Sequence, residues 1–98
     1  MSRIEIIREL AGQAHTAEDS YFDICKAIAL IFPKQIVEQL EQLVNGPVWD
    51  GDVISKADRG VLFDMGLAIR VCHKGEQGYT GANYTAFTIL KELKKLSS

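Results

Sequence analysis

The stretch over residues 46–71 constrains the fold of this chain most, because it combines a helix stop, a short helix and a strand with little loop between them. Gly46 readily takes the left-handed backbone that ends a helix, and the proline after it cannot continue one. Ser55 has the hydroxyl of a helix N-cap, and Gly66 is the next stop. The pattern therefore predicts a helix over about 56–65 that passes directly into a strand.

Amphipathic patterns on either side of this stretch predict further helices and one β-hairpin. Ser2 and Glu5 have the spacing of a capping box, which begins a first helix. Apolar residues then recur at helical spacing in several segments, and two β-prone runs surround a polar, glycine-bearing loop. The predicted helices cover about 3–14, 17–31, 33–44, 56–65 and 85–96, and the predicted strands cover 67–72 and 79–84. The expected fold class is α+β, mainly helical.

Three details of these elements are also predicted. Thr16 is expected to cap the second helix and Thr85 the last one, because hydroxyls accept hydrogen bonds from the first free amides of a helix. On the last helix, Leu93 and Leu96 share the spacing of the apolar stripe and are expected to face the core.

The composition predicts one soluble domain over residues 1–98. The chain has 98 residues of which 47% are hydrophobic, enough for a core without a metal or disulfide staple. No apolar run is long enough for a membrane span or a signal peptide, so we expect a cytoplasmic protein. Cys25 and Cys72 are far apart and lack metal-ligand spacing, so both are expected to be buried free thiols.

Charge is distributed unevenly along the chain. Residues 1–50 contain four Lys and Arg against eight Asp and Glu, whereas residues 51–98 contain seven against five. The halves therefore carry about −4 and +2 at neutral pH. Nucleic-acid binders usually present a strongly basic face, so this mild asymmetry counts against DNA binding without excluding it.

The order of elements from Pro33 onward is helix, tight turn, short helix, strand, polar loop, strand and helix, and this order resembles a winged helix-turn-helix domain. The most specific part is residues 61–70, similar to the end of a recognition helix that enters the first wing strand through Gly-Leu. Residues 79–90 resemble the second wing strand and a C-terminal helix. The resemblance implies a winged-helix-like core over 33–98 with a β-hairpin wing, after an N-terminal two-helix extension over 1–32.

This resemblance implies binding of DNA by a small, non-enzymatic regulator. Between Gly46 and Ser55 there is room for barely one turn of the middle helix of that family, so the motif is abbreviated. The Gly-Pro-Val-Trp-Asp-Gly-Asp segment also looks like part of small bacteriophage or prophage proteins of no assigned activity. The residues that would contact phosphates are Lys56, Arg59, Arg70, His73 and Lys74.

A protein-interaction module is the alternative function. The acidic first half, together with Asp58 and Asp64 on the helix that resembles a recognition helix, disfavours contact with phosphates. The residues that would bind a protein partner, or a second copy of the chain, are Trp49, Asp50 and Asp52. Trp49 either packs into the core, the favoured interpretation, or anchors an interface. The two aspartates either shape a turn, which is again favoured, or bind a hard cation or act in acid–base chemistry.

Catalytic residues are not expected. Cys72 and His73 are neighbours, but adjacent side chains on a strand point to opposite faces, so they cannot easily act together. We expect Cys72 in the core and His73 at the tip of the hairpin. No combination of nucleophile, base and orienting group is recognisable, so the chain is predicted to be no enzyme, with no metal and no cofactor.

Overall fold

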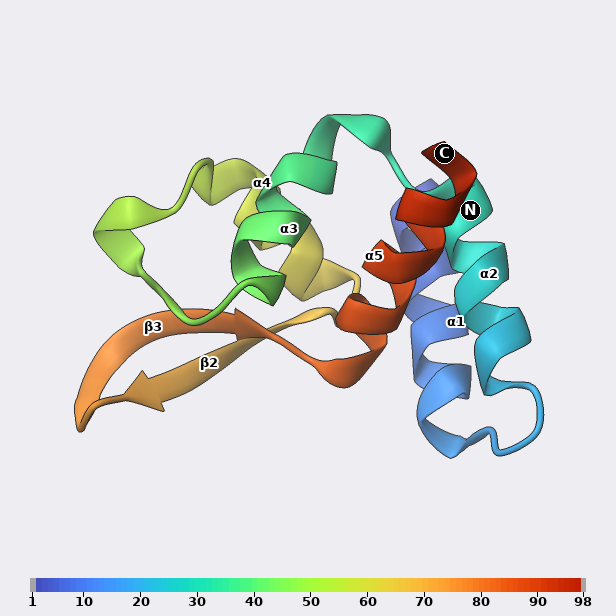
Figure 1. The fold of residues 1–98 in the computed structure, drawn as a ribbon, viewed down its shortest axis with the longest axis horizontal. Coiled ribbons are helices and arrows are strands. Elements are labelled where there is room, and N and C mark those ends of the chain that lie inside the picture. Colours follow the sequence, from blue (N-terminus) through green and yellow to red (C-terminus); the bar gives the residue numbers. More distant parts are fainter. Residues whose placement is uncertain (1, 98) are drawn as a thin grey trace.

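The computed structural model describes residues 2–97 and places a three-stranded antiparallel sheet beside a group of α-helices (Figure 1). The predicted class, a mainly helical α+β fold, is confirmed. With η marking a 3-10 helix, the elements are α1 (Arg3–Thr16), α2 (Tyr21–Ile31), η1 (Lys34–Ile36), α3 (Val37–Val44), β1 (Val48–Trp49), η2 (Asp50–Asp52), α4 (Lys56–Asp64), β2 (Ala68–His73), β3 (Glu76–Ala82) and α5 (Tyr84–Ser97).

The helix starts follow local capping chemistry, with two corrections. Ser2 caps α1 as predicted, because its hydroxyl accepts the amide of Glu5 at 3.2 Å. Thr16 does not cap α2, because α1 continues through it and its hydroxyl donates to the carbonyl of Gln13. Asn83, and not Thr85, caps α5: its side-chain oxygen accepts the Ala86 amide at 2.9 Å. Ser20 holds the N-cap position of α2 without a side-chain hydrogen bond to the helix, and Thr85 lies inside α5.

The hairpin is tighter and longer than expected. His73 pairs with Glu76, so only Lys74 and Gly75 form the turn, and both have positive φ, at 53° and 78°. Two consecutive residues with positive φ match the right-handed twist of the strands that they join. The predicted strand over 79–84 therefore begins earlier, at Glu76, and ends at Ala82, before α5 starts.

The sheet has the strand order β1-β3-β2 and presents two different faces. Residues opposite each other in an antiparallel pair share a face. Thr80 pairs with Val48 and is fully buried on the face that packs toward α3. The next pair, Tyr79 and Trp49, lies on the opposite face, and Trp49 is 45% exposed. This second face is the candidate binding surface described below.

One hydrophobic cluster joins the helices from both parts of the chain. Ile7 of α1 and Ile28 of α2 are fully buried in the same cluster as Leu62 of α4 and Ile89 of α5. The hydroxyl of Tyr21 adds polar contacts to the α5 threonines. The helices within residues 2–32 therefore contribute to the same core as those within residues 33–97 and are more than an appended extension.

Figure 1 shows two regions at opposite ends of the long axis of the molecule. The hairpin end consists of residues 48–55 and 68–82, which form β1, η2, β2 and β3. The helical end consists of α1, α2 and the C-terminal half of α5. Leu96, expected to face the core, is 57% exposed at the helical end, because the last turn of α5 provides one wall of an open groove.

Candidate functional site

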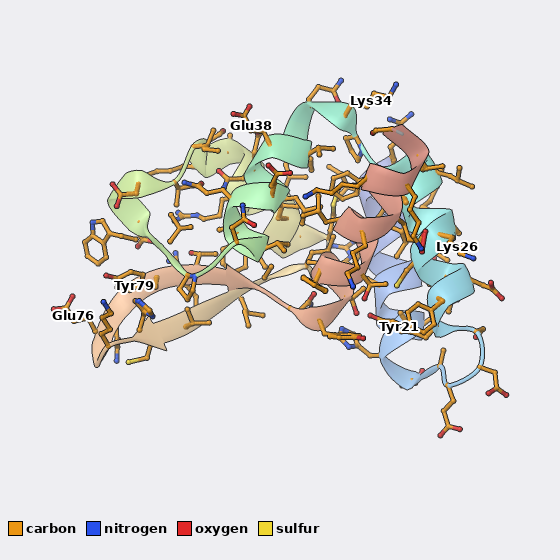
Figure 2. All side chains as sticks on the ribbon, in the orientation of Figure 1. Tyr21, Lys26, Lys34, Glu38, Glu76 and Tyr79 are labelled. Carbon is orange, nitrogen blue, oxygen red and sulfur yellow. The ribbon has the colours of Figure 1, made fainter. Side chains whose placement is uncertain are left out.

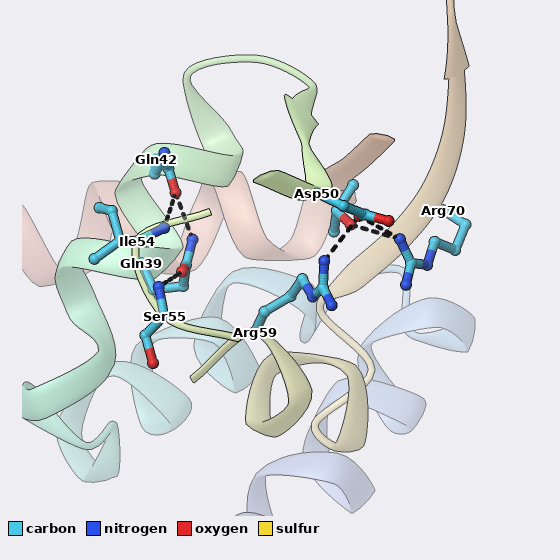
Figure 3. A network of polar contacts seen from close by, with 8 residues as sticks. Gln39, Gln42, Asp50, Ile54, Ser55, Arg59 and Arg70 are labelled. Atoms are coloured by element: carbon cyan, nitrogen blue, oxygen red, sulfur yellow. Dashed lines mark hydrogen bonds and ion pairs between the residues drawn. The ribbon is translucent and has the colours of Figure 1, made fainter. Parts of the chain in front are cut away.

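Asp50 is the centre of the polar contacts at the hairpin end (Figure 3). Its Oδ1 atom accepts hydrogen bonds from Nη1 of Arg59 at 2.8 Å and from Nη1 of Arg70 at 2.7 Å. The hydrogen bond from Arg70, with the positive charges of both arginines, lowers the pKa of Asp50 below its ordinary value. The ionised carboxylate thus connects η2 with α4 and with β2.

The two arginines at Asp50 differ in their exposure to solvent. Arg59 was predicted to contact phosphates, but its side chain is only 14% exposed, because η2 folds back and places Asp50 against it. Arg70 also donates to Thr80 Oγ1 at 3.3 Å, and its guanidinium carbon lies 5.5 Å from the centre of the Phe63 ring. Arg59 is therefore largely enclosed, whereas 55% of the Arg70 side chain stays exposed while it donates to Asp50 and Thr80.

Two glutamines of α3, which sequence reasoning missed, hold the segment between η2 and α4 (Figure 3). Gln39 Oε1 accepts the amide of Ser55 at 2.8 Å, and Gln42 Oε1 accepts the amide of Ile54 at 3.0 Å. Gln42 Nε2 also donates to the backbone carbonyl of Asp52 at 2.8 Å. Gln39 is 1% exposed. Its position on the apolar stripe of α3 could have indicated this role, because a buried side-chain amide needs hydrogen-bond partners.

The exposed sheet face consists of Trp49, Ile69, Val71, His73 and Tyr79. The Tyr79 ring lies between the other two rings, with its centre 5.6 Å from that of Trp49 and 5.1 Å from that of His73. Ile69 is 42% exposed on the same face. Figure 2 shows Tyr79 near the far end of the hairpin, away from the helices. Aromatic side chains from three strands thus form a continuous row.

Trp49 lies outside the core, which corrects the favoured prediction. A Cβ atom added to Gly78 would lie 2.5 Å from the Trp49 ring, and one added to Gly51 would lie 2.9 Å from its Nε1. The indole therefore packs closely on two glycines that have no side chain to displace it. It is held in place while nearly half of its surface is exposed.

The remaining predicted site residues do not converge. Lys56 begins α4, whereas Lys74 occupies the hairpin turn, and both side chains are exposed. Within residues 2–97 neither lysine forms an ion pair. His73 is half-buried against Tyr79, and the carboxylate of Asp52 has no ion pair among these residues. Of the five basic candidates, Arg59 and Arg70 are the pair that the described structure brings to a shared partner, Asp50.

The cysteines occupy opposite environments. Cys25 is fully buried, as expected, and burial raises the pKa of its thiol. Cys72 is exposed, which corrects the expectation of a buried thiol, because β2 extends beyond the core at this point. In the part of the chain that the structure describes, no group of three or more His, Cys, Asp and Glu residues could hold a metal ion.

Comparisons with known proteins give no relative. No family model matches the chain, and no curated protein or solved structure matches it significantly. Among residues 2–97, no helix is both long and apolar enough to cross a membrane. The resemblance to winged-helix domains and to phage proteins, and the expected cytoplasmic location, therefore stay predictions.

Proposed function

We propose that this chain is a non-enzymatic protein-interaction module on a winged-helix-like scaffold, and that it binds its partner through the exposed sheet face. The scaffold is supported by the strand order β1-β3-β2 and by a short helix that runs into the hairpin. The observation that carries the functional proposal is the shared engagement of Arg59 and Arg70 by Asp50.

That arrangement disfavours DNA as the ligand of α4. Phosphate contacts require cations that face solvent, since the affinity comes from neutralising the DNA backbone. On α4 the Arg59 side chain is only 14% exposed and donates to Asp50, and the remaining charges are Lys56, Asp58 and Asp64. The surface of this helix therefore offers no excess of positive charge to a phosphate backbone.

The sheet face has the composition of a protein-binding surface. Trp and Tyr are enriched at interfaces because they bury a large area with few rotatable bonds. Here Trp49 is fixed by the glycines beneath it, and Tyr79 is fixed between two rings, so little side-chain entropy would be lost on binding.

The single tryptophan of the chain provides a direct assay. A partner captured from a bacterial lysate, then purified, is titrated while the Trp49 emission is recorded. Because binding would remove water from the indole, we expect a blue shift. Ile69→Lys keeps the fluorophore and places a charge on the same face, so binding should weaken by about tenfold or more.

Phe22→Ala serves as the matched control, because Phe22 is an aromatic residue that is 57% exposed at the helical end. It should bind like the wild type. Equal losses in Phe22→Ala and Ile69→Lys, or a bound complex in which Trp49 emission is unchanged, would contradict the proposal.

Nucleic-acid binding is the second candidate, and the exposed rings favour it, because bases can stack on a row of aromatic side chains. This version uses Lys56 and Lys74 as the free phosphate contacts. It predicts affinity for single-stranded or duplex DNA that falls with salt, with a smaller slope in the double variant Lys56→Ala, Lys74→Ala. A flat anisotropy titration at low salt excludes it, whereas a measurable slope favours it over the protein partner.

A further inference from the structure

A second surface with exposed apolar side chains lies at the helical end, far from the sheet face. A groove of about 580 Å³ lies between the C-terminal part of α2, the start of α3 and the last turns of α5. Leu30 of α2 is 71% exposed, and Leu96 of α5 is 57% exposed. Two smaller hollows continue the groove on either side of Leu30. The floor is formed by side chains that also touch the core, among them Leu90 and Leu93.

Leu30 has no structural reason to be apolar. The core face of α2 is occupied by other residues, such as Cys25 and Ile28, which are fully buried. Leu30 instead points away from this face, beside Lys26, where a helix of a globular protein normally has polar residues. A large apolar side chain on a solvent face contributes little to the stability of the isolated chain, but it can anchor a partner.

The rim of the groove is positively charged, although the protein as a whole carries a net charge of −2. Arg3, Lys26 and Lys34 line the groove and its continuations, and none of the three forms an ion pair within residues 2–97. Figure 2 shows Lys26 and Lys34 at the helical end. The two carboxylates that line the groove are neutralised: Glu41 by Lys94 at 3.6 Å, and Glu92 by Lys95 at 3.3 Å.

We propose that this groove binds an amphipathic helix of a protein partner that carries acidic residues beside its apolar face. The apolar floor between helices fits the side chains of a helix laid into a groove. The uncompensated cations on the rim select acidic flanks by charge complementarity. The proposal is independent of the sheet face and goes beyond the function proposed above, because it assigns a second surface and the chemistry of its ligand.

Two synthetic peptides test the proposal on the full chain. Both are helix-favouring and about 14 residues long, roughly 20 Å as a helix, with leucines at the same helical spacing. One has glutamates at the flanking positions, and the other has lysines there. By fluorescence anisotropy at low salt, we expect the acidic peptide to bind about tenfold tighter or more than the basic one. The double variant Lys26→Glu, Lys34→Glu should remove or reverse that preference.

Substitution of an exposed leucine locates the site without risk to the fold. Leu30→Gln should weaken binding of the acidic peptide by about tenfold, because the exposed leucine is the proposed anchor. Ile54→Gln is the matched control, since Ile54 is 52% exposed and lies at the hairpin end. It should leave the affinity unchanged.

Several results would overturn the proposal. Equal binding of the two peptides, no binding of either, or equal losses in Leu30→Gln and Ile54→Gln would each refute it. Sedimentation of the protein alone as a dimer that Leu30→Gln converts to a monomer would show that a second copy occupies the groove. Because Ile69→Lys alters only the sheet face, a normal peptide titration of that variant separates this proposal from the function proposed above.

Discussion

The hairpin end and the helical end both expose apolar side chains, but different forces hold the two surfaces in place. At the hairpin end, Trp49 and Tyr79 lie on a sheet whose connections to the body are polar, through Asp50 and its two arginines. At the helical end, Leu30 and Leu96 stand at the edge of the continuous core. The comparison indicates that the sheet face depends on a few specific contacts, whereas the groove depends on the packing of the whole domain.

The largest expected change in stability comes from removing side-chain volume at the helical end, and the hairpin end should respond much less. Ile28→Ala removes a fully buried side chain shared by the helices and should lower the free energy of unfolding by about 2–5 kcal/mol. Val71→Ala trims a partly exposed strand residue and should cost about 1 kcal/mol or less. Urea unfolding measures both variants. Equal costs would show that the hairpin end is as much a part of the core as the helices.

A smaller effect is expected from a clash beneath the indole. Gly78→Ala adds a Cβ atom 2.5 Å from the Trp49 ring at a residue with φ of 91°, so the variant should be less stable by about 1–3 kcal/mol. Thermal unfolding measures the loss, and Trp49 emission should shift as the ring moves. Gly12→Ala is the control. Gly12 lies inside α1, and apart from the neighbouring backbone of that helix no atom lies within 4 Å of the added Cβ, so this variant should be neutral or stabilising. An unshifted Trp49 emission in Gly78→Ala would contradict the close packing.

The smallest effect concerns the polar connection at Asp50. Its folded-state pKa is lowered by Arg70 and Arg59, so its contribution to stability is complete above about pH 4 and is lost as pH falls through the lowered pKa. Asp50→Asn removes the carboxylate, so its melting temperature should lie below that of the wild type near neutral pH. The gap should narrow in acid. A gap that is constant with pH would show that the ion pairs contribute nothing and that the loss comes from altered packing.

Local sequence chemistry predicted most of the elements and few of the contacts. Gly66 and Ser55 correctly bounded α4, and the capping box at Ser2 correctly placed the start of α1. The linkers were less predictable. Thr16 and Thr85 were predicted to cap helices, but Thr16 lies within α1 and Asn83 caps α5. Several polar residues near a helix start can accept the same amide, so the sequence does not show which of them does so. The short turn of the hairpin was missed because Lys74 takes a positive φ that lysine seldom adopts.

The candidate site was less predictable than the fold. Trp49, Asp50 and both arginines were predicted as site residues from the sequence, but the contacts among them were not. Arg59 was predicted to contact phosphates, but it lies against a carboxylate nine positions earlier in the chain. The role of Gln39 was not predicted, because its importance comes from the backbone amide of Ser55, which only the folded chain places beside it.

The sequence by itself therefore determined the helices, the hairpin and the fold class, because caps, glycine stops and hydrophobic periodicity act over a few neighbouring residues. Only the tertiary structure decided that Trp49 is exposed, that Asp50 engages two arginines and that Leu30 borders a groove. Each of these depends on where segments distant in sequence meet. The same side chain is buried, paired or exposed according to what another element places against it.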